Sequence, residues 1–354
     1  MEVTLPAPHV SIVLRVEEMS GVDGARRYGR RLAQVHGFNE SDAGRVALVV
    51  TEAATNIVQH ARHGEILLRP LVHESPVSIE VLALDRGPGI AQVAQALQDG
   101  YSTGGSAGLG LGAIARLSTA FEITSTPGKG TAILARIAPA GSEPFRTAGL
   151  EFGVVCAPKH GEEVCGDAWA VTRGPGRSSV LIVDGLGHGP LAFEAAQRVA
   201  GAFRAQGSEG PEQSLRALHA SMQADRSSRG AVAAVLEVDW RRREVRYAGA
   251  GNISGSLVPR EGRISNLVSH SGTLGENVTR FQEFTHRWPE EGLIILHSDG
   301  LLNPWELEPY RGLSRKHPSL IAGVLYRDFA NRRDDVVVLV GREREKRTTE
   351  GGAP

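Results

Sequence analysis

The sequence is poor in cysteine, and its positive and negative charges nearly cancel. Cys156 and Cys165 are the two cysteines among 354 residues. Two cysteines cannot staple a chain of this length, and their spacing fits no zinc-binding pattern, so we expect two reduced, structural thiols. The formal net charge is −1. This balance gives no electrostatic basis for binding nucleic acid or an anionic membrane, and we expect neither as a partner.

Long apolar runs are lacking as well. No run approaches the roughly 20 residues that span a bilayer. The first residues, Met1 to Pro6, lack the basic region and apolar core of a signal peptide. We therefore expect a cytoplasmic protein. Hydrophobic residues at 41% and charged residues at 22% are typical of a globular protein, and 354 residues suggest two domains.

The first third of the chain contains a predicted helix with a polar stripe. The segment Asn39-Glu40-Ser41-Asp42 has the pattern of a helix start, and apolar residues at helical spacing continue to about Ala61. Glu52, Asn56 and His60 are each four residues apart, so they lie on one face of this helix. Such a stripe, taken alone, would be a surface facing solvent.

Glycine is abundant, with 43 residues, and three glycine motifs follow this helix. A predicted strand over 77–84 leads into Asp85-Arg86-Gly87-Pro88-Gly89. The glycine-rich segment 100–112 precedes a helix expected over 113–121. The turn Gly128-Lys129-Gly130-Thr131 precedes a strand expected over 132–137. Glycine-rich backbone ahead of a helix N-terminus can form a cradle for phosphate groups.

These four motifs, in this order, resemble the boxes of the GHKL nucleotide-binding fold, the Bergerat fold, over residues about 8 to 138. The resemblance implies an α/β sandwich that binds ATP and Mg²⁺. By this resemblance, Glu52 would act as general base on the attacking hydroxyl, and Asn56 would bind Mg²⁺. Asp85 would accept a hydrogen bond from the adenine amino group. The remaining nucleotide contacts would come from Gly87, Gly89, Gly108, Gly110, Gly112 and Thr131. His60 is explained equally well as a structural or a functional histidine.

The branch of this family follows from what surrounds the motifs. About 40 residues precede the predicted helix, with no helical hairpin carrying a phospho-accepting histidine, and no transducer domain follows. The segments 51–61 and 99–103 are similar to those of the RsbT-like serine kinases of bacterial partner-switching modules. Such kinases phosphorylate serine or threonine on small STAS-domain proteins. We place this domain at residues 1–138 and a linker rich in Pro, Gly and Ala at 139–147.

The second domain, expected over 148–342 before a tail at 343–354, presents aspartates at the ends of predicted strands. Many strands with helices over 191–206 and 211–224 favour an α+β sandwich. The aspartates are Asp167, Asp184 in Asp184-Gly185-Leu186-Gly187-His188-Gly189, Asp299 and Asp335. Oxygen ligands without a His/Cys cluster indicate Mg²⁺ or Mn²⁺, and a pair of such ions can activate a bridging water. One such aspartate alone would be read as a turn residue.

The set of aspartates resembles that of the SpoIIE branch of PPM-type metal-dependent serine/threonine phosphatases, and the short domain is similar to the RsbX-like enzymes. The resemblance implies an α-β-β-α sandwich in which catalytic Asp184 bridges two Mn²⁺ or Mg²⁺ ions and Gly185 offers its carbonyl. Asp299 and Asp335 would hold one metal, and Asp167 would act directly or through water. We expect a structural role for His188 and leave Asn252 open. Asp334 is expected to be structural, although Asp334 and Asp335 could be exchanged.

Together the two resemblances imply a bifunctional serine/threonine kinase and phosphatase. Its substrate would be a STAS-domain partner in a bacterial partner-switching or stressosome-like pathway. Two alternatives remain open. In one, the first domain sequesters a partner such as a sigma factor. In the other, ATP binding gates the phosphatase.

Overall fold

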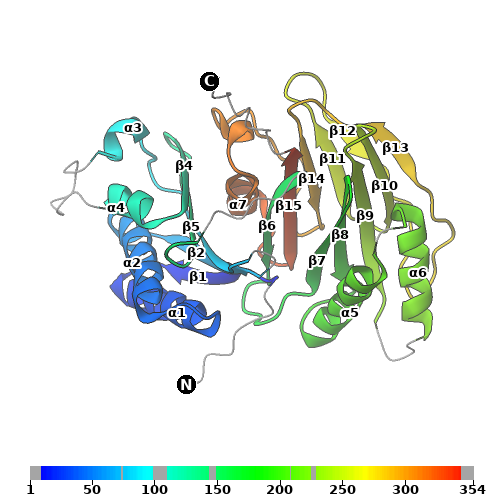
Figure 1. The fold of residues 1–354 in the computed structure, drawn as a ribbon, viewed down its shortest axis with the longest axis horizontal. Coiled ribbons are helices and arrows are strands. Elements are labelled where there is room, and N and C mark those ends of the chain that lie inside the picture. Colours follow the sequence, from blue (N-terminus) through cyan, green and yellow to red (C-terminus); the bar gives the residue numbers. More distant parts are fainter. Residues whose placement is uncertain are drawn as a thin grey trace, which may run out of the picture.

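The chain forms two α+β domains that contain three five-stranded antiparallel sheets between them (Figure 1). The computed structural model describes residues 9–72, 75–98, 110–142, 149–207, 209–224 and 229–343. Within these residues, no helix is long and apolar enough to cross a membrane. The expected linker over 139–147 and the expected tail over 343–354 lie mostly outside the described residues.

The N-terminal domain consists of one sheet with helices on one face. Its strands, in the order β1-β2-β3-β5-β4, are β1 (Ile12–Val16), β2 (Gly64–Leu71), β3 (Ser78–Asp85), β5 (Gly130–Ile137) and β4 (Ala120–Thr126). Its helices are α1 (Met19–Val35), α2 (Glu40–Asn56), the short α3 (Val93–Ala96) and α4 (Gly110–Leu117). Apolar side chains of α1, α2 and α4 pack with those of the strands into one core. The sheet therefore has a second face that another element must cover.

Helix α2 begins where its sequence dictates. The Asn39 side chain accepts a hydrogen bond from Asp42 N at 2.8 Å and caps the helix, and Glu40 adds negative charge to the first turn. The apolar stripe of α2 is fully buried. After Asn56 the chain continues as a π-helical turn, Ile57–Ala61, and leaves it at Arg62 with a φ of 68°. This turn packs against the loop that follows β3, because a Cβ at Gly87 would lie 2.7 Å from the Cβ of Ala61.

The C-terminal domain is a sandwich of two sheets with helices outside both. The first sheet, in the order β13-β10-β9-β8-β7, contains β13 (Phe284–Arg287), β10 (Glu244–Ala250), β9 (Ala231–Asp239), β8 (Arg177–Gly185) and β7 (Asp167–Gly174). The second, in the order β12-β11-β14-β15-β6, contains β12 (Ser265–Leu267), β11 (Ser254–Val258), β14 (Leu293–His297), β15 (Val336–Glu343) and β6 (Leu150–Ala157). Helices α5 (Pro190–Gln206) and α6 (Pro211–Ala224) cover the first sheet, and α7 (Pro318–Phe329) covers the second. A 3₁₀ turn, Leu313–Arg315, precedes α7.

Helix α7 lies between the two domains and packs on both (Figure 1). Every residue from Pro318 to Arg327 is buried, as expected for a helix enclosed on all sides. Leu82 and Leu134 of the N-terminal sheet share one apolar cluster with Leu320, Leu325 and Val338 of the C-terminal domain. The second face of the N-terminal sheet is therefore covered by the C-terminal domain, and the two domains share a core.

A buried ionic network reinforces this shared core. Glu80 on β3 accepts hydrogen bonds from Arg69 at 2.7 Å, from Arg136 at 2.8 and 2.9 Å, and from the Ser319 hydroxyl of α7 at 2.7 Å. Burial alone would raise the pKa of Glu80, but the neighbouring Arg69 and Arg136 hold this pKa well below its ordinary value. Glu80 is therefore a charged residue in the interior, fully compensated from both domains.

Local predictions from the sequence met with different outcomes. The expected helices over 191–206 and 211–224 are α5, which begins one residue earlier at Pro190, and α6. The helix expected over 113–121 is wrong at both ends, because α4 begins at Gly110 and ends at Leu117, and Phe121 lies in β4. Strands β2 and β4 were not expected. Cys156 and Cys165 are buried and free, with their sulfur atoms 3.7 Å apart.

Candidate nucleotide and metal sites

The first candidate site lies where α2, α4 and the ends of β3 and β5 meet. Asn56 is half-buried at the end of α2, and its Nδ2 atom is buried without a hydrogen-bond partner in the part of the chain that the structure describes. A Cβ at Gly110, the first residue of α4, would lie 3.1 Å from Asn56 Oδ1. The absence of a side chain at Gly110 thus leaves room for the Asn56 amide between the two helices. A buried amide nitrogen without an acceptor among the described residues fits a site where a ligand supplies one.

Asp85 is held rigidly at the end of β3. Its Oδ1 accepts hydrogen bonds from the backbone amides of Gly87 at 2.8 Å and Thr131 at 3.1 Å. Burial raises the pKa of Asp85, and the two backbone hydrogen bonds oppose this rise. A carboxylate fixed through one oxygen in this way can accept a hydrogen bond from an exocyclic amino group. This chemistry fits the adenine contact expected for Asp85.

The loop after Asp85 requires glycine for its close packing. Gly89 has a φ of 76°, and a Cβ there would lie 2.4 Å from the Thr126 carbonyl oxygen. This loop therefore sits directly on the turn between β4 and β5, which places Thr131 beside Asp85. The sequence showed these glycines as a pattern, and the structure gives the contacts that require them.

The structure brings most of the expected nucleotide residues together. Glu52 is half-buried on α2, one turn before Asn56, and Gly112 is buried in α4. Gly108 lies outside the described residues, as does most of the glycine-rich segment 100–112. The described part of the site, with an unpartnered amide and a fixed carboxylate, fits a bound nucleotide.

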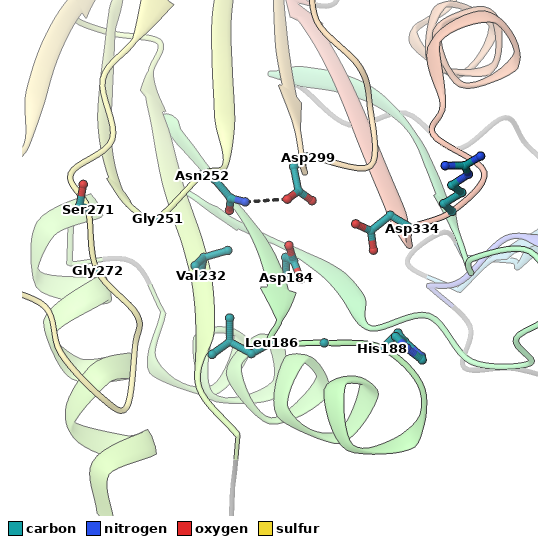
Figure 2. A pocket seen from close by; sticks show the side chains of 12 residues that line it. Asp184, Leu186, His188, Val232, Gly251, Asn252, Ser271, Gly272, Asp299 and Asp334 are labelled. Atoms are coloured by element: carbon teal, nitrogen blue, oxygen red, sulfur yellow. Dashed lines mark hydrogen bonds between the residues drawn. The ribbon is translucent and has the colours of Figure 1, made fainter.

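The second candidate site is an acidic cavity of about 630 Å³ at one end of the C-terminal sandwich. Three carboxylates line it. Asp184 ends β8, Asp299 follows β14, and Asp334 precedes β15. Figure 2 shows these three side chains pointing toward one another across the cavity. They come from both sheets, so the sandwich itself assembles the site.

Mutual repulsion marks this cavity as a site for a cation. Burial, followed by the charges of Asp299, Asp334 and Asp335, raises the pKa of Asp184 to about 7. Burial and the charge of Asp334 also raise the pKa of Asp299. Carboxylate oxygens that repel one another are a hard donor set that suits Mg²⁺ or Mn²⁺. Among the described residues, no three Asp, Glu, His or Cys side chains already converge closely enough to hold a metal ion.

The neighbouring aspartates Asp334 and Asp335 occupy different environments. Asp335 is 3% exposed, and its two oxygens accept hydrogen bonds from the backbone amides of Lys159 at 2.7 Å and Gly166 at 2.9 Å. Asp334 lines the cavity, and Asp335 does not. Asp334 therefore belongs to the cavity wall, whereas Asp335 anchors the segment between β6 and β7, and which of the two binds metal stays a prediction.

Asp167 lies behind Asp184 rather than on the cavity wall. The two residues face each other on the paired strands β7 and β8. Asp167 Oδ2 accepts a hydrogen bond from the Ser298 hydroxyl at 2.6 Å, whereas Oδ1 is buried without a partner among the described residues. Burial and the charge of Asp184 raise the pKa of Asp167 well above its ordinary value. Asp167 therefore lies on the neighbouring strand, where it can hold Asp184 in position from behind the cavity wall.

Two further residues line the cavity, and Gly185 lies behind its wall. The Asn252 side-chain amide, which the sequence left open, donates a hydrogen bond to Asp299 Oδ2 at 2.7 Å (Figure 2). His188 is on the cavity wall and pairs with Glu162 at 3.0 Å. Gly185 is not on the wall, but a Cβ there would lie 2.3 Å from the Ala192 carbonyl oxygen, so glycine lets α5 pack against the end of β8. The sequence left the role of Asn252 open, because its partner Asp299 lies 47 positions away in the chain.

The folds and the two sites define a protein in which a histidine kinase-like ATPase domain precedes a PP2C-type phosphatase domain. The family described as "Histidine kinase-like ATPase domain" matches residues 17–137, and the family "Stage II sporulation protein E (SpoIIE)" matches residues 174–342. The chain belongs to these two families, with an RsbT-like N-terminal domain and a SpoIIE-type C-terminal domain.

Individual relatives match each part. The chain is 35% identical over 111 residues to "Serine/threonine-protein kinase RsbT" of Bacillus subtilis, covering 31% of this chain and 84% of that protein. It is 26% identical over 185 residues to "Phosphoserine phosphatase RsbX" of the same organism, covering 52% of this chain and 89% of that protein. A solved structure titled "The bacterial stressosome: a modular system that has been adapted to control secondary messenger signaling" matches with 30% identity and a TM-score of 0.50. That match covers 55% of this chain and 99% of that one.

Proposed function

We propose that this chain is both a serine/threonine kinase and a serine/threonine phosphatase, and that both activities act on a STAS-domain partner in a bacterial partner-switching pathway. The observation that carries the proposal is the presence, in one chain, of a fixed carboxylate site at Asp85 and an acidic cavity at Asp184. Relatives named as a kinase and as a phosphoserine phosphatase support opposite reactions on one phosphoryl group.

In the phosphatase half, we propose that Asp184, Asp299 and Asp334 would hold two Mg²⁺ or Mn²⁺ ions, with Asp184 as the central carboxylate. When bound, such ions polarise the phosphoryl group and lower the pKa of a bound water. We assign Asp334 in place of Asp335, because both oxygens of Asp335 already accept backbone hydrogen bonds. Asn252 orients Asp299, and Asp167, itself held by Ser298, supports Asp184. The Gly185 carbonyl remains a proposed ligand.

In the kinase half, the proposed roles follow the positions of the side chains. Asp85 accepts a hydrogen bond from the adenine amino group, with its carboxylate already oriented by Gly87 and Thr131. The side-chain oxygen of Asn56, which lies beside Gly110, would hold the Mg²⁺ that accompanies the ATP phosphates. Glu52, one turn earlier on α2, accepts the proton of the attacking serine or threonine hydroxyl.

The test uses the purified full-length chain with a panel of STAS-domain proteins from the same organism. With radiolabelled ATP and Mg²⁺, we expect phosphate to transfer to one of these proteins, and Glu52→Gln to abolish the transfer. With Mn²⁺ and the phosphorylated protein, we expect release of phosphate, and Asp184→Asn to abolish the release. Glu194→Gln, an exposed change on α5, is the matched control and should affect neither reaction.

Two outcomes would contradict the proposal. The first is a protein that binds ATP but transfers phosphate to none of the STAS-domain proteins. Tight binding of a STAS-domain protein or a sigma factor without transfer would make the N-terminal domain a sequestering module instead. The second is hydrolysis that persists in Asp184→Asn.

A further inference from the structure

A buried arginine of the phosphatase domain reaches into the back of the nucleotide site. Arg327, near the end of α7, is 4% exposed. Its Nη1 atom donates hydrogen bonds to the backbone carbonyl oxygens of Asp85 at 2.9 Å and Thr131 at 3.3 Å. Asp85 and Thr131 are also joined to each other through the Thr131 amide and the Asp85 carboxylate. Arg327 therefore holds together the two strand ends that orient Asp85.

The contact is reciprocal, because an arginine of the N-terminal domain reaches back. Arg86, which follows Asp85, donates hydrogen bonds to the Arg327 carbonyl and to the Asp328 carboxylate. Asp328 in turn accepts hydrogen bonds from the Arg327 guanidinium at 2.6 Å and from the Tyr310 hydroxyl at 2.7 Å. Both oxygens of this carboxylate are used, so the end of α7 is bonded to the loop that carries Asp85.

The same helix end leads directly into the acidic cavity. Just after α7, Ala330 pairs with Leu301, and Asn331 N donates a hydrogen bond to Gly300 O at 2.7 Å, which joins this segment to the loop that carries Asp299. Asp334 N donates to Asn331 O at 3.1 Å, and the Asp334 side chain lines the cavity. Residues 327–334 are therefore one short bonded segment, with the nucleotide site at its start and the cavity at its end.

A second tie holds this segment to the N-terminal domain. Arg332 donates hydrogen bonds to the Glu65 carboxylate of β2 at 3.0 and 3.1 Å and to the Tyr326 hydroxyl at 2.6 Å. The backbone carbonyl of Arg332 accepts a hydrogen bond from His160 N at 3.3 Å. The position of the segment thus depends on both domains and not on the phosphatase sandwich alone.

We propose that Arg327 is a positioning residue of the nucleotide site, supplied by the phosphatase domain, and that through it nucleotide binding and metal binding strengthen each other. This inference rests on the two sites of the proposed function. A nucleotide that fixes Asp85 and Thr131 also fixes the carbonyls to which Arg327 donates, and so orders residues 327–334. Metal binding requires the same segment to be ordered, because the proposed metal ligand Asp334 belongs to this segment. Each ligand therefore lowers the ordering cost of the other, and the coupling must be reciprocal.

The test compares Arg327→Met with Arg69→Met in the full-length chain. Arg69 is a suitable control because it is also a buried arginine at the domain interface, but it binds Glu80 at 2.7 Å and stacks on Trp169 and contacts neither site. Three quantities are measured. They are the affinity for a non-hydrolysable ATP analogue with Mg²⁺ by calorimetry, the hydrogen exchange of residues 327–334, and the Mn²⁺ concentration for half-maximal hydrolysis of p-nitrophenyl phosphate at fixed free metal.

In the unmodified protein, we expect the analogue to slow exchange in residues 327–334 and to lower the half-saturating Mn²⁺ concentration about fivefold or more. The Arg327→Met variant should bind the analogue about tenfold more weakly. In this variant the analogue should neither slow exchange in residues 327–334 nor lower the half-saturating Mn²⁺ concentration. Arg327→Lys, which keeps a donor, should restore part of each. Arg69→Met should keep both effects. If Arg327→Met does not fold, Arg86→Met removes the reciprocal contact from a more exposed position and should also weaken both effects.

The inference fails if the unmodified protein binds the analogue and hydrolyses the ester with Mn²⁺, but the analogue leaves exchange and metal dependence unchanged. It also fails if the coupling persists in a folded Arg327→Met variant, or if the analogue weakens metal binding. In each of these cases the proposed function still stands. If the unmodified protein does not bind the analogue, or does not hydrolyse the ester, it is the proposed function that is contradicted.

Discussion

Asn252 donates a hydrogen bond to Asp299 across 2.7 Å and so connects the turn after β10 with the loop after β14. Burial and the charge of Asp334 raise the pKa of Asp299, whereas this hydrogen bond lowers it. A donor that favours the ionised carboxylate also favours cation binding at the same carboxylate. The amide therefore has a role in the cavity even though it carries no charge.

From this contact we expect Asn252→Ala to raise the metal concentration needed for half-maximal phosphatase activity about tenfold or more, which is typical for residues that orient metal ligands. The measurement is a Mn²⁺ titration of p-nitrophenyl phosphate hydrolysis. Asn266→Ala is the control, since Asn266 is exposed and accepts a hydrogen bond from Ser256 away from the cavity. An unchanged Mn²⁺ requirement in Asn252→Ala would show that Asp299 needs no orientation.

Asp334 and Asp335 should respond in opposite ways to the same change. Asp334→Asn should abolish metal-dependent hydrolysis and raise the stability of the metal-free protein, because it removes one of several repelling charges. Asp335→Asn should lower the stability by about 1–3 kcal/mol, because asparagine has a single acceptor oxygen and leaves one of the two backbone amides without an acceptor. Urea unfolding of both variants without metal tests this. Equal losses of stability would contradict the separate roles.

The pKa of about 7 at Asp184 predicts a dependence of stability on pH. The folded protein holds this proton more tightly than the unfolded chain, whose aspartate titrates near 3.8. The stabilising effect of the proton is therefore fully present below about pH 4 and is lost as the pH rises toward 7. In the metal-free protein, the difference in unfolding free energy between Asp184→Asn and the unmodified chain should grow across this range by a few kcal/mol, since one pKa unit corresponds to about 1.4 kcal/mol.

Saturating Mg²⁺ provides the control for this pH dependence. A bound cation favours the ionised carboxylates, so the loss of stability between pH 4 and 7 should become smaller or reverse in the unmodified chain. A difference between the two proteins that does not change with pH, with and without Mg²⁺, would show that Asp184 titrates normally.

Glu80 tests how far the two domains depend on each other. Glu80→Gln leaves Arg69 buried without its counter-charge, so we expect a loss of about 3–5 kcal/mol in unfolding free energy. We also expect unfolding to separate into two transitions, because Ser319 of α7 loses its charged acceptor on the N-terminal sheet. Calorimetry of Glu80→Gln against the exposed change Glu194→Gln measures both effects. A single transition at an unchanged temperature would mean that the apolar contacts of α7 suffice.

Much of the candidate chemistry was visible in the sequence, because it depends on short segments. Asp85 and Asp184 each follow an apolar strand, and glycines follow both residues because the chain turns sharply there. The helices over 211–224 and 318–329 have clear starts at proline and apolar spacing. Strand β2 was not expected, since Arg69 and Glu65 interrupt its apolar pattern. Arg69 binds Glu80 on the neighbouring strand β3, and Glu65 binds Arg332 across the domain interface.

The sequence by itself determined the two domain types, the positions of the glycine turns and the aspartates that end strands, because these depend on backbone geometry within a few residues. Only the tertiary structure decided which of Asp334 and Asp335 faces the cavity, because neighbouring residues point in different directions and the packing of the segment between β6 and β7 captures one of them. Only the tertiary structure, too, placed Arg327 on Asp85, 242 positions away in the sequence. That contact exists because α7 has apolar residues on all sides and is stable only when sheets from both domains cover it.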